Sequence, residues 1–140
     1  MGEIAIRCCD FSAMEDFYSN IIGLPLLQGF HRDGILFFQL GESHGGHTQV
    51  LALFHYDAGR PELPPRAGEA PQTGARSSLH HIALAVDRSE QDAICAWYDK
   101  KGLAYRVEEF GWIGWRGIFT TDPDGNTLEL VAYDRSLLIS

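Results

Sequence analysis

Three residues in strand-like segments have side chains suited to ligate a divalent metal ion: Glu3, His81 and Glu129. A carboxylate and an imidazole on neighbouring strands, with a further carboxylate from an equivalent strand elsewhere in the chain, form a mixed nitrogen and oxygen site that suits Fe²⁺, Mn²⁺, Zn²⁺ or a similar ion. Two simpler interpretations stay open. Glu129 can be a solvated residue after a polar turn, and His81 can form an exposed pair with His80.

The segments around these residues share one pattern of alternation. Successive side chains of a strand point to opposite faces, so every second residue lies on the same side. In each segment one face is bulky and apolar, whereas the other carries small residues beside a candidate ligand. The ligand-bearing faces are Glu3, Ala5 and Arg7 in the first segment, His81, Ala83 and Ala85 in the second, and Thr127, Glu129 and Val131 in the third. Small residues beside a ligand indicate a cavity rather than a packed core.

The elements that position these residues can be predicted from apolar periodicity and turn residues. A helix is expected to begin near Ser12 and to end at Gly23. The segment Asp10-Phe11-Ser12 supplies its capping residues, and Ser12 forms a capping box with Glu15. A second helix is expected between Ser89, as its cap, and Gly102. The predicted strands are residues 4–6, 26–30, 35–40, 48–54, 82–86, 104–109, 115–121 and 127–132.

The predicted order β-α-β-β-β therefore occurs twice, which indicates an internal repeat. Matching points in the two halves lie 77 to 80 residues apart, among them Phe17-Tyr18 with Trp97-Tyr98 and Gly23-Leu24 with Gly102-Leu103. Residues 57–78 between the halves contain four of the six prolines and are predicted to be a linker or long loop. We expect a single domain over residues 1–140, made of modules at about 1–56 and 79–135.

Composition excludes several classes of protein. With 140 residues, 45% hydrophobic and 21% charged, the chain has the balance of a soluble globular domain, and no apolar run approaches the roughly 18 residues of a membrane span. The net charge of −8, without a basic cluster, argues against nucleic acid as a partner. The chain has three cysteines and no CxxC motif, which predicts free thiols. No secretory signal is visible at its start, so we expect a reducing, cytoplasmic location.

Two longer motifs resemble a known group of proteins. They are Leu79-His80-His81-Ile82-Ala83-Leu84-Ala85-Val86 and Asp122-Pro123-Asp124-Gly125-Asn126-Thr127-Leu128-Glu129-Leu130, supported by Asp10, Phe17-Tyr18 and Gly23-Leu24. Together they are similar to the vicinal-oxygen-chelate superfamily, which includes glyoxalase I, extradiol dioxygenases and the fosfomycin and bleomycin resistance proteins. The resemblance covers nearly the whole chain, although it is not specific for any one activity.

The resemblance implies an α+β fold in which two βαβββ modules form a cupped mixed β-sheet around a central cavity. It also implies a divalent metal ion (Fe, Mn, Zn or Ni) bound by Glu3, His81 and Glu129, with Glu129 as the catalytic residue. The sequence departs from the glyoxalase pattern at two positions. Glu3 stands where the first module usually has His or Gln, and Ala52 stands where glyoxalase I has its other glutamate. His47 or His55 is a candidate replacement ligand.

The leading hypothesis is therefore a metal-dependent enzyme of glyoxalase or dioxygenase type, whose ion chelates adjacent oxygens of a small-molecule substrate. The alternative is a metal-free protein that binds a small molecule, such as an antibiotic, on the same fold. Candidate pocket residues are Tyr105, Trp115 and Arg116, from the second module. A homodimer is expected from the resemblance.

Overall fold

The chain divides into two compact units, Met1–Gln72 and Thr73–Ser140, and each is described by itself. The structure is a computed structural model that describes residues 1–30, 34–57 and 70–139. Most of the Pro-rich segment predicted as a linker lies outside the described residues. No helix in the described ranges is long and apolar enough to cross a membrane.

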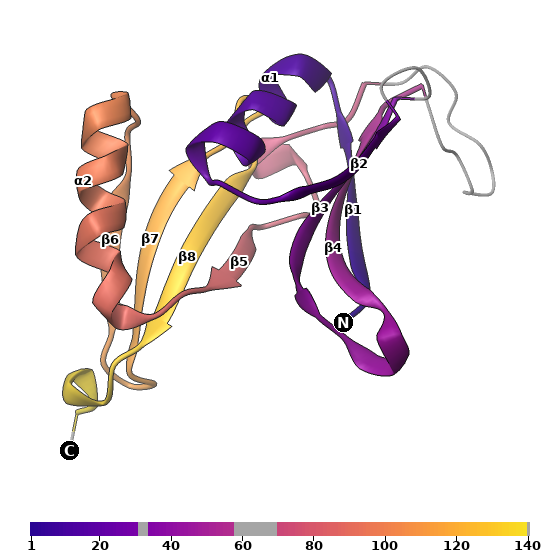
Figure 1. The fold of residues 1–140 in the computed structure, drawn as a ribbon. Helices are drawn as coiled ribbons and strands as arrows, with labels where there is room; N and C mark the ends of the chain where they lie inside the picture. The colour runs from indigo at the N-terminus through magenta and orange to yellow at the C-terminus, as the bar shows by residue number, and fades with distance from the viewer. Residues whose placement is uncertain (31–33, 58–69, 140) are drawn as a thin grey trace. The chain divides into compact units, whose positions relative to one another are not determined.

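Unit 1 contains one four-stranded mixed sheet with the strand order β1-β4-β3-β2. Strands β1 and β4 are parallel, and the other neighbours are antiparallel. The elements are β1 (Glu3–Cys8), α1 (Phe11–Asp16), a π-helical turn (Phe17–Ile21), β2 (Leu26–Phe30), β3 (Ile35–Glu42), a 3-10 turn (His44–Gly46) and β4 (Thr48–His55). A parallel pair of strands needs a crossover connection, which α1 and the strands after it provide (Figure 1).

Unit 2 repeats this arrangement with the order β5-β8-β7-β6, again with one parallel pair, β5 and β8. Its elements are β5 (Ile82–Ala85), α2 (Gln91–Lys101), β6 (Arg106–Phe110), β7 (Trp115–Thr121) and β8 (Thr127–Tyr133), with 3-10 turns at Gly74–Arg76, Arg88–Glu90 and Arg135–Leu137. Figure 1 shows α2 along the sheet. The two mixed sheets confirm the predicted α+β fold of two βαβββ modules.

Each unit buries an apolar core on the helix side of its sheet. In unit 1 the fully buried side chains come from α1, the π-helical turn and one face of β1, β3 and β4; they include Cys8, Met14, Tyr18, Leu36, Phe38, Leu51 and Leu53. In unit 2 they include Tyr98, Ile118 and Leu128. Buried apolar surface contributes about 25 cal/mol per Å², so these faces stabilise both sheets and fix which face is left for a site. Burial alternates as predicted in β1, whereas consecutive residues are buried in the middle of β4 (residues 50–53) and of β8 (residues 128–130).

α1 begins at Phe11, close to the predicted start near Ser12, but the capping side chains differ from the predicted capping box and cap. Asp10, not Ser12, is the N-cap of α1, and its carboxylate accepts a hydrogen bond from the backbone N–H of Ala13 at 3.1 Å. Ser89 lies within a 3-10 turn and does not cap α2, whose N-cap residue makes no side-chain cap hydrogen bond. Asp10, Ser12 and Ser89 are all short polar side chains near a helix start. The backbone conformation around each one decides whether it caps the helix. Gly102 ends α2 in the left-handed region, at φ 67°, as expected.

The turn before β8 is held by Asp122, which is 4% exposed. Its carboxylate accepts hydrogen bonds from the backbone N–H of Asp124 at 3.0 Å and of Asn126 at 2.9 Å, and from the Asn126 side chain at 2.9 Å. A buried carboxylate with several donors orders the turn and sets where β8, and therefore Glu129, begins.

The Asp122→Ala variant is expected to lower the free energy of unfolding by about 2–3 kcal/mol, because it leaves buried donors without an acceptor. Urea unfolding followed by circular dichroism measures this loss. Asp87→Ala is the matched control, since Asp87 is exposed and makes no side-chain cap hydrogen bond; a change within about 0.5 kcal/mol is expected there. Equal losses in both variants would contradict the role given to the turn.

Candidate functional site

The register of the sheet in unit 2 places one row of residues across its four strands. Ala83 of β5 pairs with Glu129 of β8, Glu129 pairs with Phe119 of β7, and Phe119 pairs with Arg106 of β6. Residues paired across strands point to the same face, so all four side chains lie on the face opposite the buried core. His81 comes two residues before Ala83 and lies on the same face. Its ring centroid is 6.2 Å from that of Phe119.

His81 and Glu129 form the central contact of this face. His81 Nε2 lies 3.2 Å from Glu129 Oε2, and the two side chains are 33% and 7% exposed. The other ring nitrogen, His81 Nδ1, lies 2.7 Å from His80 Nδ1, where one ring donates the hydrogen bond and the other accepts it. A partner on one ring nitrogen orients the ring and directs the other nitrogen, here Nε2, toward the carboxylate.

The Glu129 carboxylate lies over a residue without a side chain. A Cβ atom at Gly117 of β7 would be 2.3 Å from Glu129 Oε1 and 2.8 Å from a ring carbon of Phe119. Real Cβ atoms do not approach other atoms so closely, so Gly117 is the residue that makes room for the carboxylate. The absence of a side chain at this position is therefore part of the site.

Burial raises the pKa of the Glu129 carboxyl above its ordinary value; interactions with His81 lower it in part, and the charge of Glu108 on β6 raises it further. Since the raised pKa exceeds that of the unfolded chain, the folded state keeps a proton on Glu129 at pH values where the unfolded state has released it. The free energy of unfolding therefore falls as pH rises through this window.

The Glu129→Gln variant removes this titration. In the metal-free protein, we expect wild type to lose stability relative to the variant as pH rises above about 4, the ordinary glutamate pKa. Urea unfolding at a series of pH values in EDTA measures the difference. Glu109→Gln, on the same sheet but the opposite face, is expected to leave the pH dependence of wild type unchanged. A wild-type protein that gains stability relative to Glu129→Gln over this range would contradict the assignment.

The geometry of the pair fits a shared divalent ion. Two ligand atoms each about 2.1 Å from one ion, at adjacent coordination positions, are roughly 3 Å apart, close to the 3.2 Å between Nε2 and Oε2. An imidazole nitrogen and a carboxylate oxygen are ligands that Fe²⁺, Mn²⁺ and Zn²⁺ all accept. Among the described residues, no group of three or more His, Cys, Asp or Glu side chains is arranged to hold an ion, so this pair provides two ligands.

The predicted third ligand, Glu3, lies in unit 1, at the start of β1. The pairing of β1 with β4 matches the pairing of β5 with β8. Ala5 pairs with Ala52 in unit 1, and Ala83 pairs with Glu129 in unit 2. Glu3 is therefore the positional equivalent of His81, and Ala52, which is fully buried, is the equivalent of Glu129. Unit 1 presents one candidate ligand at these two positions, whereas unit 2 presents both.

The two other histidines considered as ligands, His47 and His55, both lie in unit 1. His55 pairs with Cys8 across β1 and β4, which places it on the face opposite Glu3. Its Nδ1 accepts a hydrogen bond from the backbone N–H of Asp57 at 3.2 Å. The His47 ring lies beside Gly2, where an added Cβ would be 3.4 Å away. The pair of His81 and Glu129 belongs to unit 2, so neither histidine lies in the unit that holds this pair.

Of the predicted pocket residues, Trp115 lies on the same face as Glu129 by register, with 45% of its surface exposed. Tyr105 lies beside α2: its ring is 5.6 Å from Tyr98, and a hydrogen bond with Asp99 raises the pKa of its hydroxyl. Tyr105 is thus brought to the helix side of the sheet rather than to the row of Glu129.

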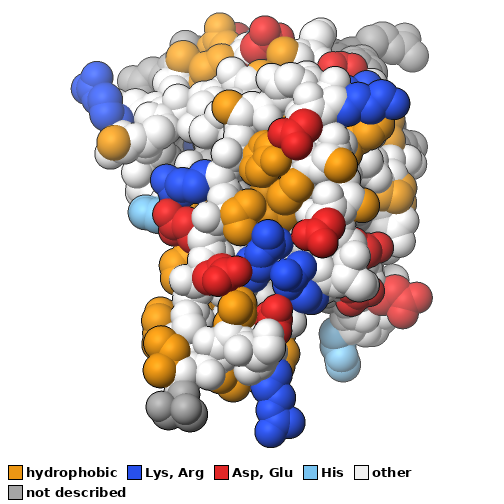
Figure 2. All heavy atoms as spheres, turned by 90° about the vertical axis from the view of Figure 1, so that its left-hand side faces the viewer, with side chains coloured by type: hydrophobic (Ala, Val, Ile, Leu, Met, Phe, Trp, Pro, Cys, Tyr) orange, Lys and Arg blue, Asp and Glu red, His pale blue; other side chains and the backbone are white. Residues whose placement is uncertain are grey.

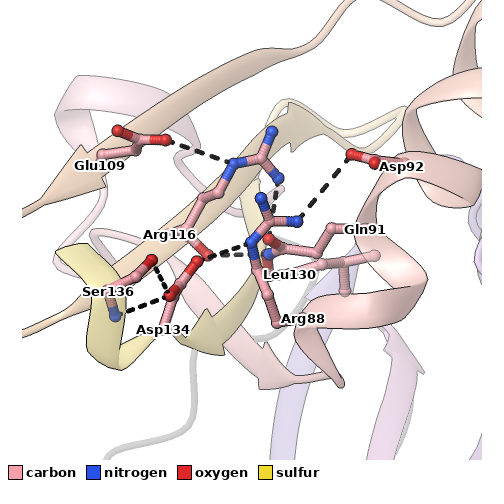
Figure 3. Close-up of polar contacts among 8 residues, drawn as sticks. All are labelled: Arg88, Gln91, Asp92, Glu109, Arg116, Leu130, Asp134 and Ser136. Carbon is pink, nitrogen blue, oxygen red and sulfur yellow. Dashed lines mark hydrogen bonds and ion pairs between the residues drawn. The ribbon is translucent and has the colours of Figure 1, made fainter.

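Arg116 also lies on the helix side, within a network of polar contacts (Figure 3). Its Nη1 donates to Gln91 Oε1 at 2.8 Å, and Gln91, fully buried, donates to the carbonyl oxygens of Arg116 at 2.8 Å and of Leu130 at 3.2 Å. Glu109 lies 3.7 Å from Arg116 Nε. The structure therefore ties Arg116 to α2 and does not bring it to Glu129.

A second set of polar contacts links the 3-10 turn before α2 with the 3-10 turn after β8 (Figure 3). Arg88 contacts Asp134 at 3.0 Å and Asp92 at 3.9 Å, and Asp134 accepts a hydrogen bond from the backbone N–H of Ser136 at 2.9 Å. Viewed from the side on which α2 lies, acidic side chains are interspersed with basic ones (Figure 2). Ion pairs of this kind order the helix side of unit 2, and they leave the opposite face as the candidate site.

Several site residues were not predicted from the sequence: His80, Arg106, Glu108, Gly117 and Phe119. Alternation alone, counted back from the turn at residues 122–126, places Phe119 and Gly117 on one face of β7. Their alignment with Glu129 depends on the pairing of β7 with β8, which a single sequence does not state. To place Arg106 and Glu108 on this face, the pairing of β6 with β7 must be known as well.

Comparison with known proteins agrees with this fold. The chain matches the Glyoxalase/Bleomycin resistance protein/Dioxygenase superfamily over residues 1–130. No protein with a curated description matches it in sequence.

Solved structures with the same fold include a lactoylglutathione lyase from Agrobacterium tumefaciens, with 22% identity, a TM-score of 0.69, and 94% of this chain and 92% of that one covered. A glyoxalase/dioxygenase from Nostoc punctiforme has 23% identity, a TM-score of 0.65, and coverage of 96% and 90%. A fosfomycin resistance protein from Listeria monocytogenes has 16% identity, a TM-score of 0.67, and coverage of 99% and 97%. At these identities the likeness shows the fold alone. On the match over residues 1–130, the chain belongs to the Glyoxalase/Bleomycin resistance protein/Dioxygenase superfamily.

Proposed function

We propose that this protein is a metal-dependent enzyme that acts on a small molecule with two adjacent oxygen atoms, by chemistry of the glyoxalase or dioxygenase type. The observation that carries the proposal is the pair of His81 Nε2 and Glu129 Oε2, 3.2 Å apart on the sheet face opposite the core. The superfamily includes enzymes with both chemistries in its name, and similar folds occur in a lactoylglutathione lyase and a glyoxalase/dioxygenase.

His81 and Glu129 would hold the ion, with Glu3 as the third ligand at the equivalent position of the first module. A bound divalent ion acts as a Lewis acid that polarises the oxygens it contacts. His80 holds the His81 ring through Nδ1 and so keeps Nε2 directed at the site. The Glu129 carboxylate is the candidate base that lies at the proposed ion, where it can take a proton from a bound substrate. We therefore assign Glu129 as the catalytic residue.

Metal analysis tests the proposal directly. Protein purified without chelators, or reconstituted with Fe²⁺, Mn²⁺, Zn²⁺ or Ni²⁺, is expected to bind one ion per chain, as measured by mass spectrometry of the metal content and by calorimetry. Turnover of catechols with and without oxygen then separates a dioxygenase, which consumes O₂, from an enzyme of glyoxalase type, which does not. Failure to bind any of the four ions would overturn the proposal.

The role of Glu3 is tested separately. If Glu3 is a ligand, Glu3→Gln lowers metal affinity by tenfold or more, the order of effect seen when a metal site loses supporting interactions. Glu42→Gln, an exposed glutamate at the end of β3 in the same unit, serves as the control. Equal affinities for wild type and Glu3→Gln would remove Glu3 from the ligand set and leave His81 and Glu129 in it.

A metal-free binding protein is the second candidate. It is favoured by the direct contact of His81 with Glu129, which satisfies both side chains without an ion when Nε2 carries the proton. Exposed aromatic side chains on the same face, Trp115 and Tyr133, would then contact the ligand. Such a protein binds small molecules equally well in EDTA and in metal-containing buffer, which separates it from the enzyme.

We also propose that the protein is a cytoplasmic homodimer. The free thiols Cys8, Cys9 and Cys95 agree with a reducing compartment. Size-exclusion chromatography with light scattering tests the dimer, and a monomeric mass at micromolar concentration would contradict it.

A further inference from the structure

Arg106 is the arginine on the face of Glu129. It is one of two basic residues in the strands of unit 2, and the other, Arg116, lies on the helix side. Arg106 pairs with Phe119, which pairs with Glu129, so the three residues form one row across β6, β7 and β8. Neighbouring strands are about 4.8 Å apart, which places the backbone of Arg106 roughly 10 Å from that of Glu129.

The side chain of Arg106 folds toward the middle of this row. Its guanidinium carbon lies 5.2 Å from the ring centroid of Phe119, a cation–π contact, and its Nε lies 2.9 Å from Glu108 Oε1. Two neighbours therefore fix the guanidinium group while 66% of the side chain stays exposed. A guanidinium group has five N–H donors, so the Nη atoms can bind an anion in bidentate geometry.

We infer that Arg106 binds a carboxylate group of the substrate and selects anionic substrates. The inference rests on the proposed function. In it, the vicinal oxygens of the substrate lie at His81 and Glu129. The body of the substrate lies over Gly117 and Phe119, and its carboxylate meets Arg106. Glu108 and Glu129 are carboxylates on the same face, and their charge would repel an anion that had no cation beside it. Arg106 supplies that cation at the end of the row opposite the metal ligands.

Binding of two matched probes to the Zn²⁺-loaded protein tests the inference. The probes are 3,4-dihydroxybenzoate and 3,4-dihydroxybenzamide, which share the vicinal oxygens and differ in the charge of the second group. Zn²⁺ is used because it has no redox chemistry with catechols. Wild type is expected to bind the benzoate about tenfold more tightly than the benzamide in calorimetry, the size of one partly exposed, charge-assisted contact.

Arg106→Gln is expected to abolish this preference while it leaves Zn²⁺ affinity unchanged. Lys100→Gln, which removes the same charge from exposed α2, is expected to keep the preference and so controls for the change in net charge. A preference that survives in Arg106→Gln would overturn the inference. So would a wild-type protein that binds Zn²⁺ and shows no preference, or binds neither probe; the proposed function would then stand without the role of Arg106.

If wild type binds no metal, the proposed function fails, and the same probes are measured with the metal-free protein. A preference for the benzoate that disappears in Arg106→Gln would support the anion site on its own. The absence of such a preference would overturn it as well.

Discussion

Glu129→Ala is expected to abolish stoichiometric metal binding and, with it, turnover. The carboxylate is one of two ligands that unit 2 brings together, and it is the better buried of the two, with 7% of its side chain exposed against 33% for His81. Loss of a supporting interaction costs a metal site 10–100-fold in affinity, so loss of a ligand is expected to cost more than about 100-fold. Calorimetric titration with Mn²⁺ and Zn²⁺ measures the change.

Glu109→Ala is the matched control for this variant. Glu109 is a glutamate in the same sheet, but it contacts Arg116 on the helix side. Its replacement is expected to leave metal affinity within about twofold of wild type, since exposed ion pairs contribute little and the side chain is far from the proposed ion. Full metal occupancy in Glu129→Ala would show that the ligands have been assigned wrongly.

The second large effect is expected from Gly117→Ala, which adds one methyl group. The new Cβ would lie 2.3 Å from Glu129 Oε1 and 2.8 Å from a ring carbon of Phe119, so the carboxylate, the ring or the backbone must move. Added volume in a packed site costs about 1–3 kcal/mol of stability. A displaced carboxylate also leaves its position beside His81 Nε2, and we expect metal affinity to fall at least tenfold.

Stability and metal affinity are measured together, so that misplacement of the carboxylate is distinguished from unfolding. Gly41→Ala is the control: Gly41 is a glycine in β3 whose added Cβ would meet nothing within 4 Å, so stability within about 0.5 kcal/mol of wild type and unchanged metal affinity are expected. If Gly117→Ala binds metal as wild type does, the space above Gly117 has no part in positioning Glu129.

Much of the fold is determined by local patterns in the sequence. The alternation in residues 82–86 and 127–132 predicts strands, and burial of Ile82, Leu128 and Leu130 confirms which face packs on the core. The repeat predicts two similar modules, because matching aromatic and Gly-Leu pairs recur at a nearly constant offset. Such signals depend on neighbours within a few residues, and these are visible in a single sequence.

The partners of each site residue depend on contacts between strands that are distant in the sequence. Arg116 and Trp115 are adjacent, so the two necessarily lie on opposite faces of β7, but only the pairing of Phe119 with Glu129 decides which of them shares the face of Glu129. A shift of one residue in this register would have exchanged them. For the same reason the sequence points to Arg116 as a pocket residue, whereas the structure places Arg106 on the face of the site.

Local patterns therefore predict the order of the elements, the two modules, and the face of its own strand on which each of His81 and Glu129 lies. Three features follow from the folded chain: Nε2 of His81 meets the carboxylate, Gly117 makes room for it, and Asp10 rather than Ser12 caps α1. Periodicity specifies the direction of a side chain relative to its own strand or helix. Distances between side chains of different strands follow from register and close packing, which are properties of the folded chain.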